Sequence, residues 1–572
     1  MEDQLTMDTG EGAIVQRVAL QEAARDRLRT RFSFRRRLVM RSLSTTPATR
    51  RRGLSQKLVA PLLIVLVLIA AGCSSSSAVT PLTPTSTVTS DEQAANGPLV
   101  GDTSKYASEQ SCAASENNQP WYATITAFEH HDSNRSHAFA CAEFLGTNSE
   151  GNNQVFAYTS PVNFPGPYNL VTGRSDALYV YGGGYGDAPN ASGSFVSRVE
   201  TGSLKEMWRH VLINTNTTNE WNYPGVVNEL ADGSLVVIYG YRMAKLNPST
   251  GVITAQVTMP TGASQPRDTS YNGYDAFPDG TIIAKSVNRE QGCQEEGFSA
   301  FLKCPNPTDV APSVMVAVDS KTFKVIAQIT LPEMVAGRIT STVYKGTDYI
   351  YLAGTSKVYR YKFSKNSFTL DPMWGPVPYL KSGQTPAPAI APLGNYVVLQ
   401  TNGTPTSTPS SVVAISQDNA NQISRIDPFA SSNAKNSIVP SMPSVDSANN
   451  RIYVIDAGPG KLAAINFNQG TLSLAWSVDQ TTLSFTTLIG PSDARVLIGT
   501  NIPVKTFQGL KYYTKEQVVW RSADTGTELA RSDYFDKMVT GILVTPGFGG
   551  LMYYLAEDGK LIAFQVGPKG SS

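Results

Sequence analysis

Four polar side chains, those of Asn222, Asn272, Asp275 and Arg338, are the first candidates for chemistry in this sequence. Each lies in a polar segment that leads into an apolar run typical of a β-strand. They offer amides, a carboxylate and a guanidinium, which suit a small polar ligand or a hard cation with oxygen ligands, such as Ca²⁺. The alternative is that they only satisfy backbone groups in a hydrated channel. They can act together only if the fold brings their segments to one place.

Three of the four histidines, His130, His131 and His137, lie close together in the chain. Neutral imidazole suits Zn or Cu, but no carboxylate or cysteine with a matching ligand spacing accompanies them. We therefore interpret this segment as a polar surface loop between Cys112 and Cys141, and we predict no metal site. The sequence also contains no Gly-rich phosphate loop, nucleophile elbow or paired-His metalloprotease motif.

The composition excludes one class of partner and favours one class of fold. The chain has 47 basic and 46 acidic residues, so it lacks the basic excess of a nucleic-acid-binding surface. Charged residues make up only 16%, while 46 glycines and 35 prolines are present. This composition is typical of an exported, turn-rich, all-β protein.

Residues 1–72 are predicted to form a basic cytoplasmic segment and a signal peptide. The apolar run 58–71 is short for a membrane span and ends at Gly72-Cys73. It resembles a bacterial lipoprotein signal, which implies that Cys73 becomes the lipid-bearing N-terminus; a transmembrane anchor is the alternative. Met40 would serve as a second possible start. Residues 73–97 are rich in Ser, Thr and Pro and are predicted to be a flexible tether.

Export also bears on the four remaining cysteines, because an oxidising compartment favours disulfides. Cys112, Cys141, Cys293 and Cys304 allow three pairings. Proximity along the chain favours Cys112 with Cys141 and Cys293 with Cys304.

A repeat organises the rest of the chain. In residues 451–476, three β-prone runs are separated by turn residues, and a single copy could not bury its apolar face. Similar apolar runs recur about every 45 to 70 residues, the period of a four-stranded propeller blade with variable loops. There are about eight of them, at 178–181, 235–239, 281–284, 349–352, 396–399, 451–455, 495–498 and 551–555. We predict an all-β, eight-bladed propeller of four-stranded antiparallel blades, with seven blades as the alternative.

The last repeat, within 549–566, has only two clear strands. The upstream run 154–159 has the β-prone character needed for a missing outer strand. We predict that it pairs with the last repeat and closes the ring, since closure removes exposed sheet edges. Residues 98–153 are then expected to be a capping segment before a propeller at 154–567.

The turns carry a resemblance to a known family. Several hairpins end in Gly, as at 244–251, 463–470 and 519–526, and Trp208, Trp476 and Trp520 lie near them. This pattern resembles the repeats of quinoprotein-like (PQQ-like) propellers and of an outer-membrane assembly lipoprotein with that fold. Enzymes of that family use adjacent cysteines, a stacking tryptophan and a calcium site. No adjacent cysteines are present here, so we predict no PQQ cofactor.

Together these features predict a lipid-anchored, extracytoplasmic lipoprotein of the cell membrane or outer envelope. Its propeller is expected to act as a binding or scaffold module for an envelope protein or a small polar ligand. Nucleic acid is not expected as a partner. The alternative is a metal-dependent small-molecule hydrolase or lactonase at the channel mouth, since calcium-dependent lactonase propellers place acids and amides in this way. No catalytic residue is assigned, and Ca²⁺ is the only cofactor considered.

Overall fold

The computed structural model describes residues 97–183, 193–214, 218, 220–295, 297, 300, 304, 310–403, 408–431, 437–503 and 515–570. The predictions for residues 1–96, including lipidation at Cys73 and the tether up to residue 96, lie outside this part of the chain. Within the described part, no helix has the length and apolar character needed to cross a membrane.

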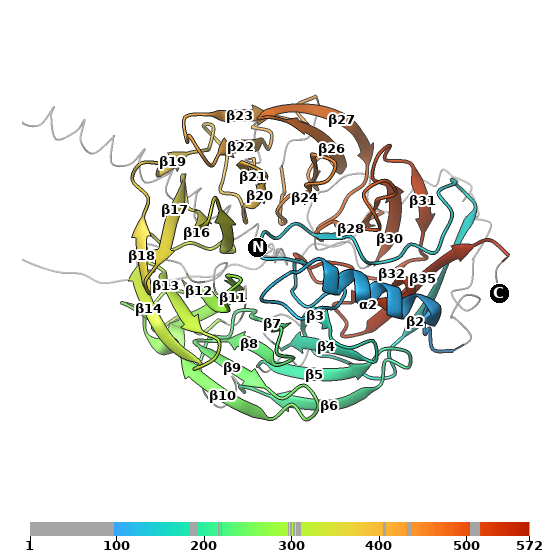
Figure 1. Ribbon diagram of the computed structural model, residues 1–572, viewed down its shortest axis with the longest axis horizontal. Helices are drawn as coiled ribbons and strands as arrows, with labels where there is room; N and C mark the ends of the chain where they lie inside the picture. Colours follow the sequence, from blue (N-terminus) through green and yellow to red (C-terminus); the bar gives the residue numbers. More distant parts are fainter. Residues whose placement is uncertain are drawn as a thin grey trace, which may run out of the picture. The chain divides into compact units, whose positions relative to one another are not determined.

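Eight antiparallel sheets surround a central axis and form an eight-bladed β-propeller (Figure 1). In blades 1 to 7 the four main strands follow chain order from the innermost to the outermost. Blades 1 and 2 contain β3 (Pro167–Thr172), β4 (Ala177–Gly182), β5 (Phe195–Glu200) and β6 (Glu206–Val211), then β7 (Val226–Glu229), β8 (Leu235–Tyr239), β9 (Arg242–Leu246) and β10 (Ile253–Thr258). Blades 3 and 4 contain β11 (Thr269–Ala276), β12 (Thr281–Asn288), β13 (Val314–Asp319) and β14 (Lys324–Thr330), then β15 (Thr340–Tyr344), β16 (Thr347–Ala353), β17 (Lys357–Ser364) and β18 (Ser367–Leu370).

The second half of the ring repeats this arrangement. Blades 5 and 6 contain β20 (Ala391–Leu393), β21 (Tyr396–Gln400), β22 (Val412–Ser416) and β23 (Ile423–Ile426), then β24 (Ser444–Asp446), β25 (Arg451–Asp456), β26 (Lys461–Asn468) and β27 (Thr471–Asp479). Blade 7 contains β28 (Thr487–Ile489), β29 (Val496–Asn501), β30 (Lys515–Ser522) and β31 (Glu528–Arg531). Two short strands, β19 (Val377–Pro378) and β32 (Phe535–Asp536), add to β17 and β30.

The prediction of eight blades is confirmed. Each of the eight predicted apolar runs overlaps the second strand of a different blade: β4, β8, β12, β16, β21, β25, β29 and β34 (Leu551–Leu555). The second strand has blade neighbours on both of its edges and is buried on both faces. Burial on both faces explains why this strand appears in the sequence as an apolar run and not as an alternating pattern.

The predicted closing strand is also confirmed. Blade 8 consists of β33 (Thr545–Pro546), β34, β35 (Leu561–Pro568) and β2 (Asn153–Thr159), which comes from the other end of the domain. β2 pairs with β35 in antiparallel register from Asn153↔Pro568 to Thr159↔Ile562. The two ends of the propeller are thus joined in one sheet.

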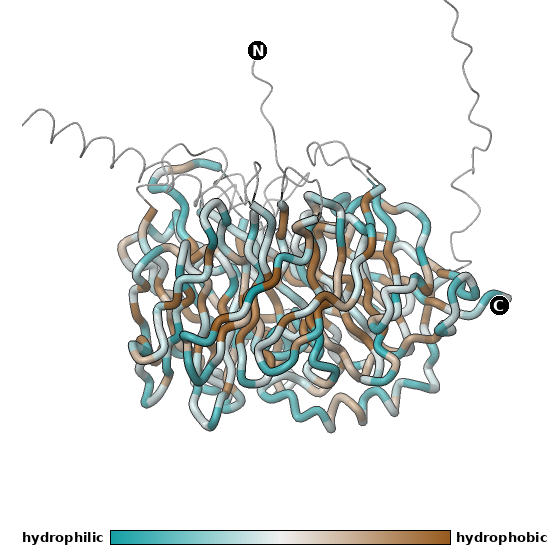
Figure 2. The backbone as a smooth tube through the Cα atoms, turned by 90° about the horizontal axis from the view of Figure 1, so that it is seen from above, coloured by the Kyte–Doolittle hydropathy of each residue, from teal (hydrophilic) through white to brown (hydrophobic). Residues whose placement is uncertain are grey.

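The strand order defines two faces of the ring. The tight turns between the first and second and between the third and fourth strands lie on one face, which we call the hairpin face. The connections between blades lie on the opposite, loop face. Seen from the side in Figure 2, hydrophobic stretches occupy the middle of the ring and hydrophilic stretches lie mostly towards its two faces. The hydrophobic core is therefore formed by side chains packed between neighbouring blades, with polar surfaces on the two faces of the ring.

Tight hairpin turns also lock neighbouring blades together. Trp208 on the outer strand of blade 1 packs against Gly251 in blade 2, and Trp476 of blade 6 packs against Gly526 in blade 7. A Cβ on Gly251 would lie 2.6 Å from the Trp208 ring, and its φ of +70° is itself favourable only to glycine. Each of these turns therefore needs glycine both for its backbone and for its contact with the previous blade.

The segment ahead of β2 begins on the hairpin face. A 3₁₀ turn, η1 (Thr103–Lys105), leads into α2 (Tyr106–Ser115), which lies across this face in Figure 1. The backbone N–H of Gly549, in the η5 turn (Phe548–Gly550), donates to Glu109 Oε2 at 2.8 Å. The prediction of both disulfides is confirmed: Cys112–Cys141 joins α2 to the chain after β1 (Ala138–Phe139), and Cys293–Cys304 closes a loop of blade 3.

Candidate functional site

Residues 118–139, which we call the channel plug, enter the centre of the ring from the hairpin face. The backbone N–H of Tyr122 donates to Glu229 O on blade 2, and that of Thr172 on blade 1 donates to Thr126 O. The plug returns to the hairpin face as β1, which adds a parallel strand to β28. The capping segment predicted at 98–153 therefore also fills part of the channel.

The plug is held by contacts with residues far away in sequence. Its Thr126 hydroxyl donates to Pro546 O of blade 8 at 2.8 Å, and the N–H of Val445 in blade 6 donates to Ser136 O at 2.9 Å. Inside the channel, Trp121 stacks on Phe128 with ring centroids 4.3 Å apart. These aromatic side chains anchor the segment because burying them removes much apolar surface from water.

The interpretation of the histidine segment as a polar surface loop is wrong. His130, His131 and His137 are 2%, 9% and 0% exposed. The segment is polar in composition, but the inner strands of several blades supply hydrogen-bond partners for it inside the channel. A buried polar segment is stable when its groups are paired in this way.

The centre of the channel holds a buried charge cluster built from both the plug and the blades. Glu129 Oε1 lies 3.4 Å from Arg135 Nη1 and 3.7 Å from Arg338 Nη1. Burial alone would raise the pKa of the Glu129 carboxyl, but Arg338, His130 and Arg135 more than offset burial and hold this pKa well below its usual range. Glu129 is therefore ionised at neutral pH and faces two guanidinium groups.

Arg135 joins the plug to blades 3 and 4. Its Nε donates to Ile339 O at 2.7 Å, and its Nη2 donates to Tyr274 O at 3.2 Å. Arg338 reaches the same cluster from the loop-face side and donates from Nη2 to the Tyr168 hydroxyl at 3.0 Å. Gly273 leaves the space for it, because a Cβ there would lie 2.1 Å from Arg338 Nη1.

Two of the histidines form a neutral pair beside this cluster. His130 Nδ1 lies 2.6 Å from His137 Nε2, and His137 Nδ1 lies 3.0 Å from the Ser444 hydroxyl of blade 6. Burial lowers the pKa of His130 to about 4 and that of His137 well below its ordinary value. Both imidazole rings are therefore neutral at pH 7. One of the two facing nitrogens carries a hydrogen and donates to the other.

His131 behaves in the opposite way. Burial would lower its pKa, but hydrogen bonds to Asp132 and Glu116 outweigh burial and raise this pKa to about 9. The His131 nitrogens lie 3.4 Å from Asp132 Oδ2 and 3.3 Å from Glu116 Oε2. Because Glu116 follows directly after α2, the protonated ring ties the channel plug to the helix on the hairpin face.

The plug backbone is strained around these residues. Four non-glycine residues in and beside it have left-handed backbones: Asn117 (φ 48°), His131 (φ 76°), Arg135 (φ 55°) and His137 (φ 60°). Such conformations cost free energy and persist where the surroundings dictate them, often at functional sites. Three of these strained residues, His131, Arg135 and His137, carry side chains that lie in or beside the charge cluster.

All four residues predicted for the channel mouth are buried, at 3% exposure or less. Asp275 and Arg338 are brought into one network by the plug, since Arg135 Nε lies 3.9 Å from Asp275 Oδ2. The Asp275 carboxylate also accepts from the N–H groups of Ala276 and Ser341, each at 2.8 Å. Burial raises the pKa of Asp275 to about 7, despite the opposing effect of Arg135.

The two asparagines are used differently. Asn272 Oδ1 accepts from the buried Lys285 ammonium at 3.0 Å, and its Nδ2 donates to Ala336 O at 2.9 Å. Asn222 Oδ1 accepts from the N–H of Gly240 at 3.3 Å. These contacts connect Asn272 to Lys285 and Ala336 and connect Asn222 to Gly240, whereas Asp275 and Arg338 contact Arg135 and Glu129 of the plug.

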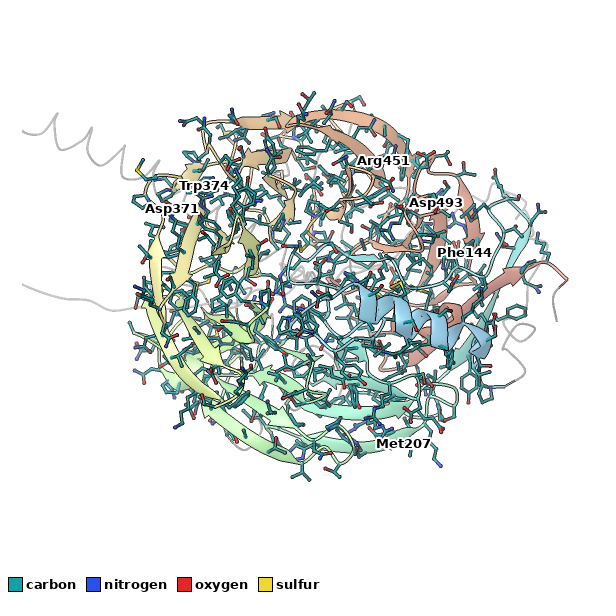
Figure 3. All side chains as sticks on the ribbon, viewed as in Figure 1. Phe144, Met207, Asp371, Trp374, Arg451 and Asp493 are labelled. Atoms are coloured by element: carbon teal, nitrogen blue, oxygen red, sulfur yellow. A yellow bond between two sulfur atoms is a disulfide. The ribbon has the colours of Figure 1, made fainter. Side chains whose placement is uncertain are left out.

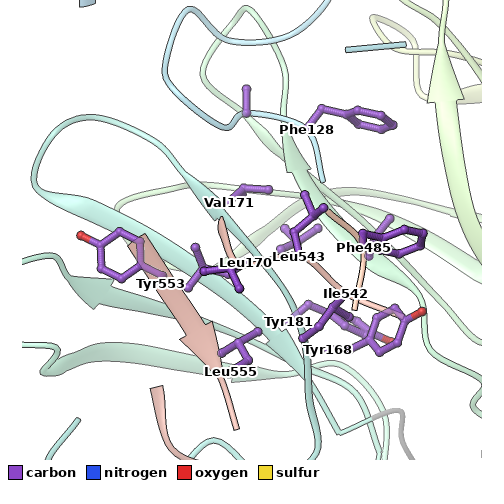
Figure 4. Close-up of a cluster of buried hydrophobic side chains, with 14 of the residues drawn as sticks. Phe128, Tyr168, Leu170, Val171, Tyr181, Phe485, Ile542, Leu543, Tyr553 and Leu555 are labelled. Carbon is purple, nitrogen blue, oxygen red and sulfur yellow. The ribbon is translucent and has the colours of Figure 1, made fainter. Parts of the chain in front are cut away.

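A small cavity of about 20 Å³ lies beside Glu129 and His130, large enough for about one water molecule. Its walls include Tyr168, Phe485 and Ile542, which belong to the buried cluster in Figure 4. Among the residues that the structure describes, no group of three or more His, Cys, Asp or Glu side chains is arranged to hold a metal ion. The groups beside this cavity hold one another in place: Glu129 lies close to Arg135 and Arg338, and His130 lies close to His137.

Sequence reasoning missed Glu129, Arg135 and Tyr168. The only local signal was the pattern of aromatic residues Trp121, Phe128 and Phe139 around the polar stretch, which is unusual for a solvated loop. Nothing local indicated the partners of these residues, because they lie in other blades.

Comparison with known proteins supports the quinoprotein-like (PQQ-like) propeller fold. The quinohemoprotein alcohol dehydrogenase ADHIIG from Pseudomonas putida HK5 superposes with a TM-score of 0.51 at 10% identity, covering 83% of this chain and 84% of that one. The quinohemoprotein alcohol dehydrogenase from Comamonas testosteroni gives 0.50 at 12% identity, covering 82% and 84%. A europium-containing methanol dehydrogenase gives 0.51 at 7% identity, covering 80% and 100%. No protein-family model and no curated protein matches the sequence. At these identities the likeness concerns the fold alone.

Proposed function

We propose that this propeller is a lipid-anchored, extracytoplasmic binding module for an envelope component. The observation that carries the proposal is the channel plug. It occupies the channel that a propeller can otherwise use for a ligand, and it engages the polar residues of the channel in contacts within the chain. The ring is left as a rigid scaffold whose connecting loops can carry recognition.

The position of the first described residues supports this arrangement. The N–H of Asp102 donates to Gly549 O at 3.0 Å, which fixes the start of the domain on the hairpin face. A tether upstream, leading from a lipid on Cys73, would therefore join the ring at that face. The loop face would then be free to meet a partner.

The test of anchoring is the substitution Cys73→Ala. It is expected to abolish metabolic labelling with a fatty-acid analogue and to leave the signal uncleaved, because the modified thiol is missing. Labelling of the variant at the parental level would contradict the lipid anchor.

The test of binding uses a photo-crosslinking amino acid in the full chain in its native host. It is placed at Gln265 or Ser382, both exposed and on the loop face, and at Lys365 as a control on the hairpin face. The same discrete adduct is expected from both loop-face positions and not from Lys365. If no loop-face position gives an adduct, the proposed partner surface is wrong.

The metal-dependent hydrolase is the competing outcome. Asp275 and Asn272 would be its calcium ligands, yet their oxygens already accept hydrogen bonds from Ala276, Ser341 and Lys285. We expect Ca²⁺ to leave the melting temperature of the detergent-solubilised chain unchanged. A rise with Ca²⁺ that Asp275→Asn abolishes would favour the hydrolase instead.

A further inference from the structure

The hydrogen positions in the His130–His137 pair follow from the contacts at its far end. Ser444 Oγ donates to Thr486 O at 2.7 Å, because a carbonyl oxygen can only accept. The single hydroxyl hydrogen of Ser444 is used there, so Ser444 Oγ accepts from His137 Nδ1 at 3.0 Å. Neutral His137 has one ring hydrogen, on Nδ1, and its Nε2 therefore carries a lone pair.

The same reasoning extends to His130 and Glu129. His137 Nε2 accepts from His130 Nδ1 at 2.6 Å, so the one ring hydrogen of neutral His130 lies on Nδ1. His130 Nε2 therefore also carries a lone pair, and it lies 3.3 Å from the carboxylate oxygen Glu129 Oε1. Two acceptors face each other at this contact, and His130 does not donate to Glu129.

The Glu129 carboxylate thus has few donors for an ionised, buried group. Within the described part of the chain it accepts one hydrogen bond, from Arg135 Nη1 to Oε1 at 3.4 Å. Arg338 Nη1 lies 3.7 Å from the same oxygen, which is too long for a hydrogen bond. Oε2 accepts no hydrogen bond from the residues that the structure describes. Because an unpaired buried carboxylate oxygen costs free energy, a donor from outside the chain is favoured.

The cavity of about 20 Å³ beside Glu129 offers room for such a donor. Side chains fill most of the centre of the ring (Figure 3), and this small space remains among them. Gly541 supports the same conclusion, since it is buried, lines the cavity and has no atom within 4 Å of a Cβ built on it. Thr545 adds a hydroxyl to the lining, so a bound molecule has two polar partners there.

Size and charge together limit what the cavity can hold. Its volume accommodates about one water molecule, and Tyr168 and Phe485, which lie close together in Figure 4, are among its walls. Arg135 and Arg338 already face the single negative charge of Glu129, so a cation would meet two positive charges. An anion would be repelled by Glu129 itself. The site therefore favours a small neutral hydrogen-bond donor.

We propose that this cavity binds one water molecule, which donates a hydrogen bond to Glu129 Oε2 and links the channel plug to Thr545 of blade 8. A bridging water of this kind stabilises nearly as well as a direct hydrogen bond. It supplies the donor that His130 cannot supply. The site lies inside the channel, so it does not depend on the proposed loop-face partner.

The direct test has two parts, both on the full chain. A crystal structure is expected to show one water within hydrogen-bonding distance of Glu129 Oε2 and Thr545 Oγ1. Magic-angle-spinning NMR with ¹⁵N-labelled histidine is expected to find the ring hydrogen of His130 on Nδ1 at pH 7. The chain has four histidines, and His130→Gln assigns the signals of this ring. A dry cavity, or a hydrogen on His130 Nε2, would overturn the proposal.

The energetic test compares Gly541→Ala with Gly346→Ala in the detergent-solubilised full chain. Both glycines have a positive φ, +76° and +73°, and neither has an atom within 4 Å of the new Cβ. Only Gly541 lines the cavity. Its new methyl group should exclude the water and lower the melting temperature by about 1–3 °C more than Gly346→Ala does, because Glu129 Oε2 is left unpaired. An equal or smaller loss in Gly541→Ala would mean that the methyl displaces no bound water.

A small cation is the competing ligand. The melting temperature of the full chain in NH₄Cl is expected to equal that in NaCl of the same ionic strength, because the two arginines disfavour a further positive charge. A higher melting temperature in NH₄Cl that Glu129→Gln abolishes would assign the cavity to ammonium and overturn the proposal.

Discussion

At the scale of single residues, His131 gives the protein a pH-dependent link between α2 and the channel plug. Its pKa is raised from the ordinary 6.5 to about 9 in the folded protein. A raised pKa means that the folded state binds the proton more tightly than the unfolded state does. The contribution of His131 to stability is therefore fully present below about pH 6.5 and is lost as the pH rises through about 9.

This effect is measured as the difference in unfolding free energy between the parent and His131→Gln at several pH values. The parent should be the more stable of the two near pH 6, and the difference should shrink between pH 7 and pH 10. Comparing the two proteins at each pH cancels the titration of most other groups. A difference that stays constant over this range would contradict the assigned protonation.

The buried Glu129–Arg338 contact makes a second prediction at this scale. Arg338→Met should destabilise the fold by about 3–5 kcal/mol, because Glu129 would lose one of its two arginines inside the channel. Glu129→Gln in the same chain should recover part of that loss. The measurement is a double-mutant cycle from denaturant unfolding. Additive losses in the double variant would show that the two side chains are not coupled.

At the scale of elements, the hairpin turns between the outer strands connect sequence to blade packing. Gly251→Ala places a Cβ 2.6 Å from the Trp208 ring of the preceding blade, in addition to its positive φ. Gly346→Ala, at a turn with φ +73° and no atom within 4 Å of the new Cβ, carries only the backbone cost. We expect about 1 kcal/mol for Gly346→Ala and about 1–3 kcal/mol more for Gly251→Ala.

Thermal or denaturant unfolding of these two variants isolates the contact between blades. Equal losses would mean that Trp208 moves aside at no cost. This turn chemistry was readable in the sequence, where Asn247 and Gly251 bracket a tight turn. The contact with Trp208 was not, because that ring comes from the neighbouring blade.

At the scale of the whole molecule, the pairing of β2 with β35 closes the ring. Deleting residues 98–160 should abolish cooperative unfolding, since it leaves an edge of β35 and an edge of β28 unpaired and also removes the channel plug. Deleting the tether at 74–97 should leave the melting temperature unchanged, because this segment precedes the secondary structure described here. A parental melting temperature after the longer deletion would contradict the role of closure.

A point variant separates the plug from the closure. Trp121→Ala keeps β2 but removes the largest apolar anchor of the plug, which is 2% exposed and stacked on Phe128. It should cost about 3–5 kcal/mol while unfolding stays cooperative. Calorimetry of the two deletion variants and of Trp121→Ala measures both the melting temperature and the cooperativity of unfolding.

Local patterning in the sequence was sufficient to predict the ring. Apolar runs bounded by turn residues indicate strands, their spacing indicates blades, and eight recurrences indicate the number of blades. The last repeat lacked an outer strand in the sequence. This gap predicted that β2 pairs with the last repeat, because pairing removes an exposed sheet edge. The cysteine pairs followed from proximity along the chain.

The centre of the ring was decided only by the tertiary structure. Thr126 donates a hydrogen bond to Pro546 O, and Glu129 forms an ion pair with Arg338. The separations of these residues in the sequence do not follow the blade repeat. A polar segment with His130 and His137 is typical of a surface loop until a channel lined by hydrogen-bonding groups is available to it. Burial of such residues depends on partners from many blades at once, so it follows from the assembled ring and from no local pattern.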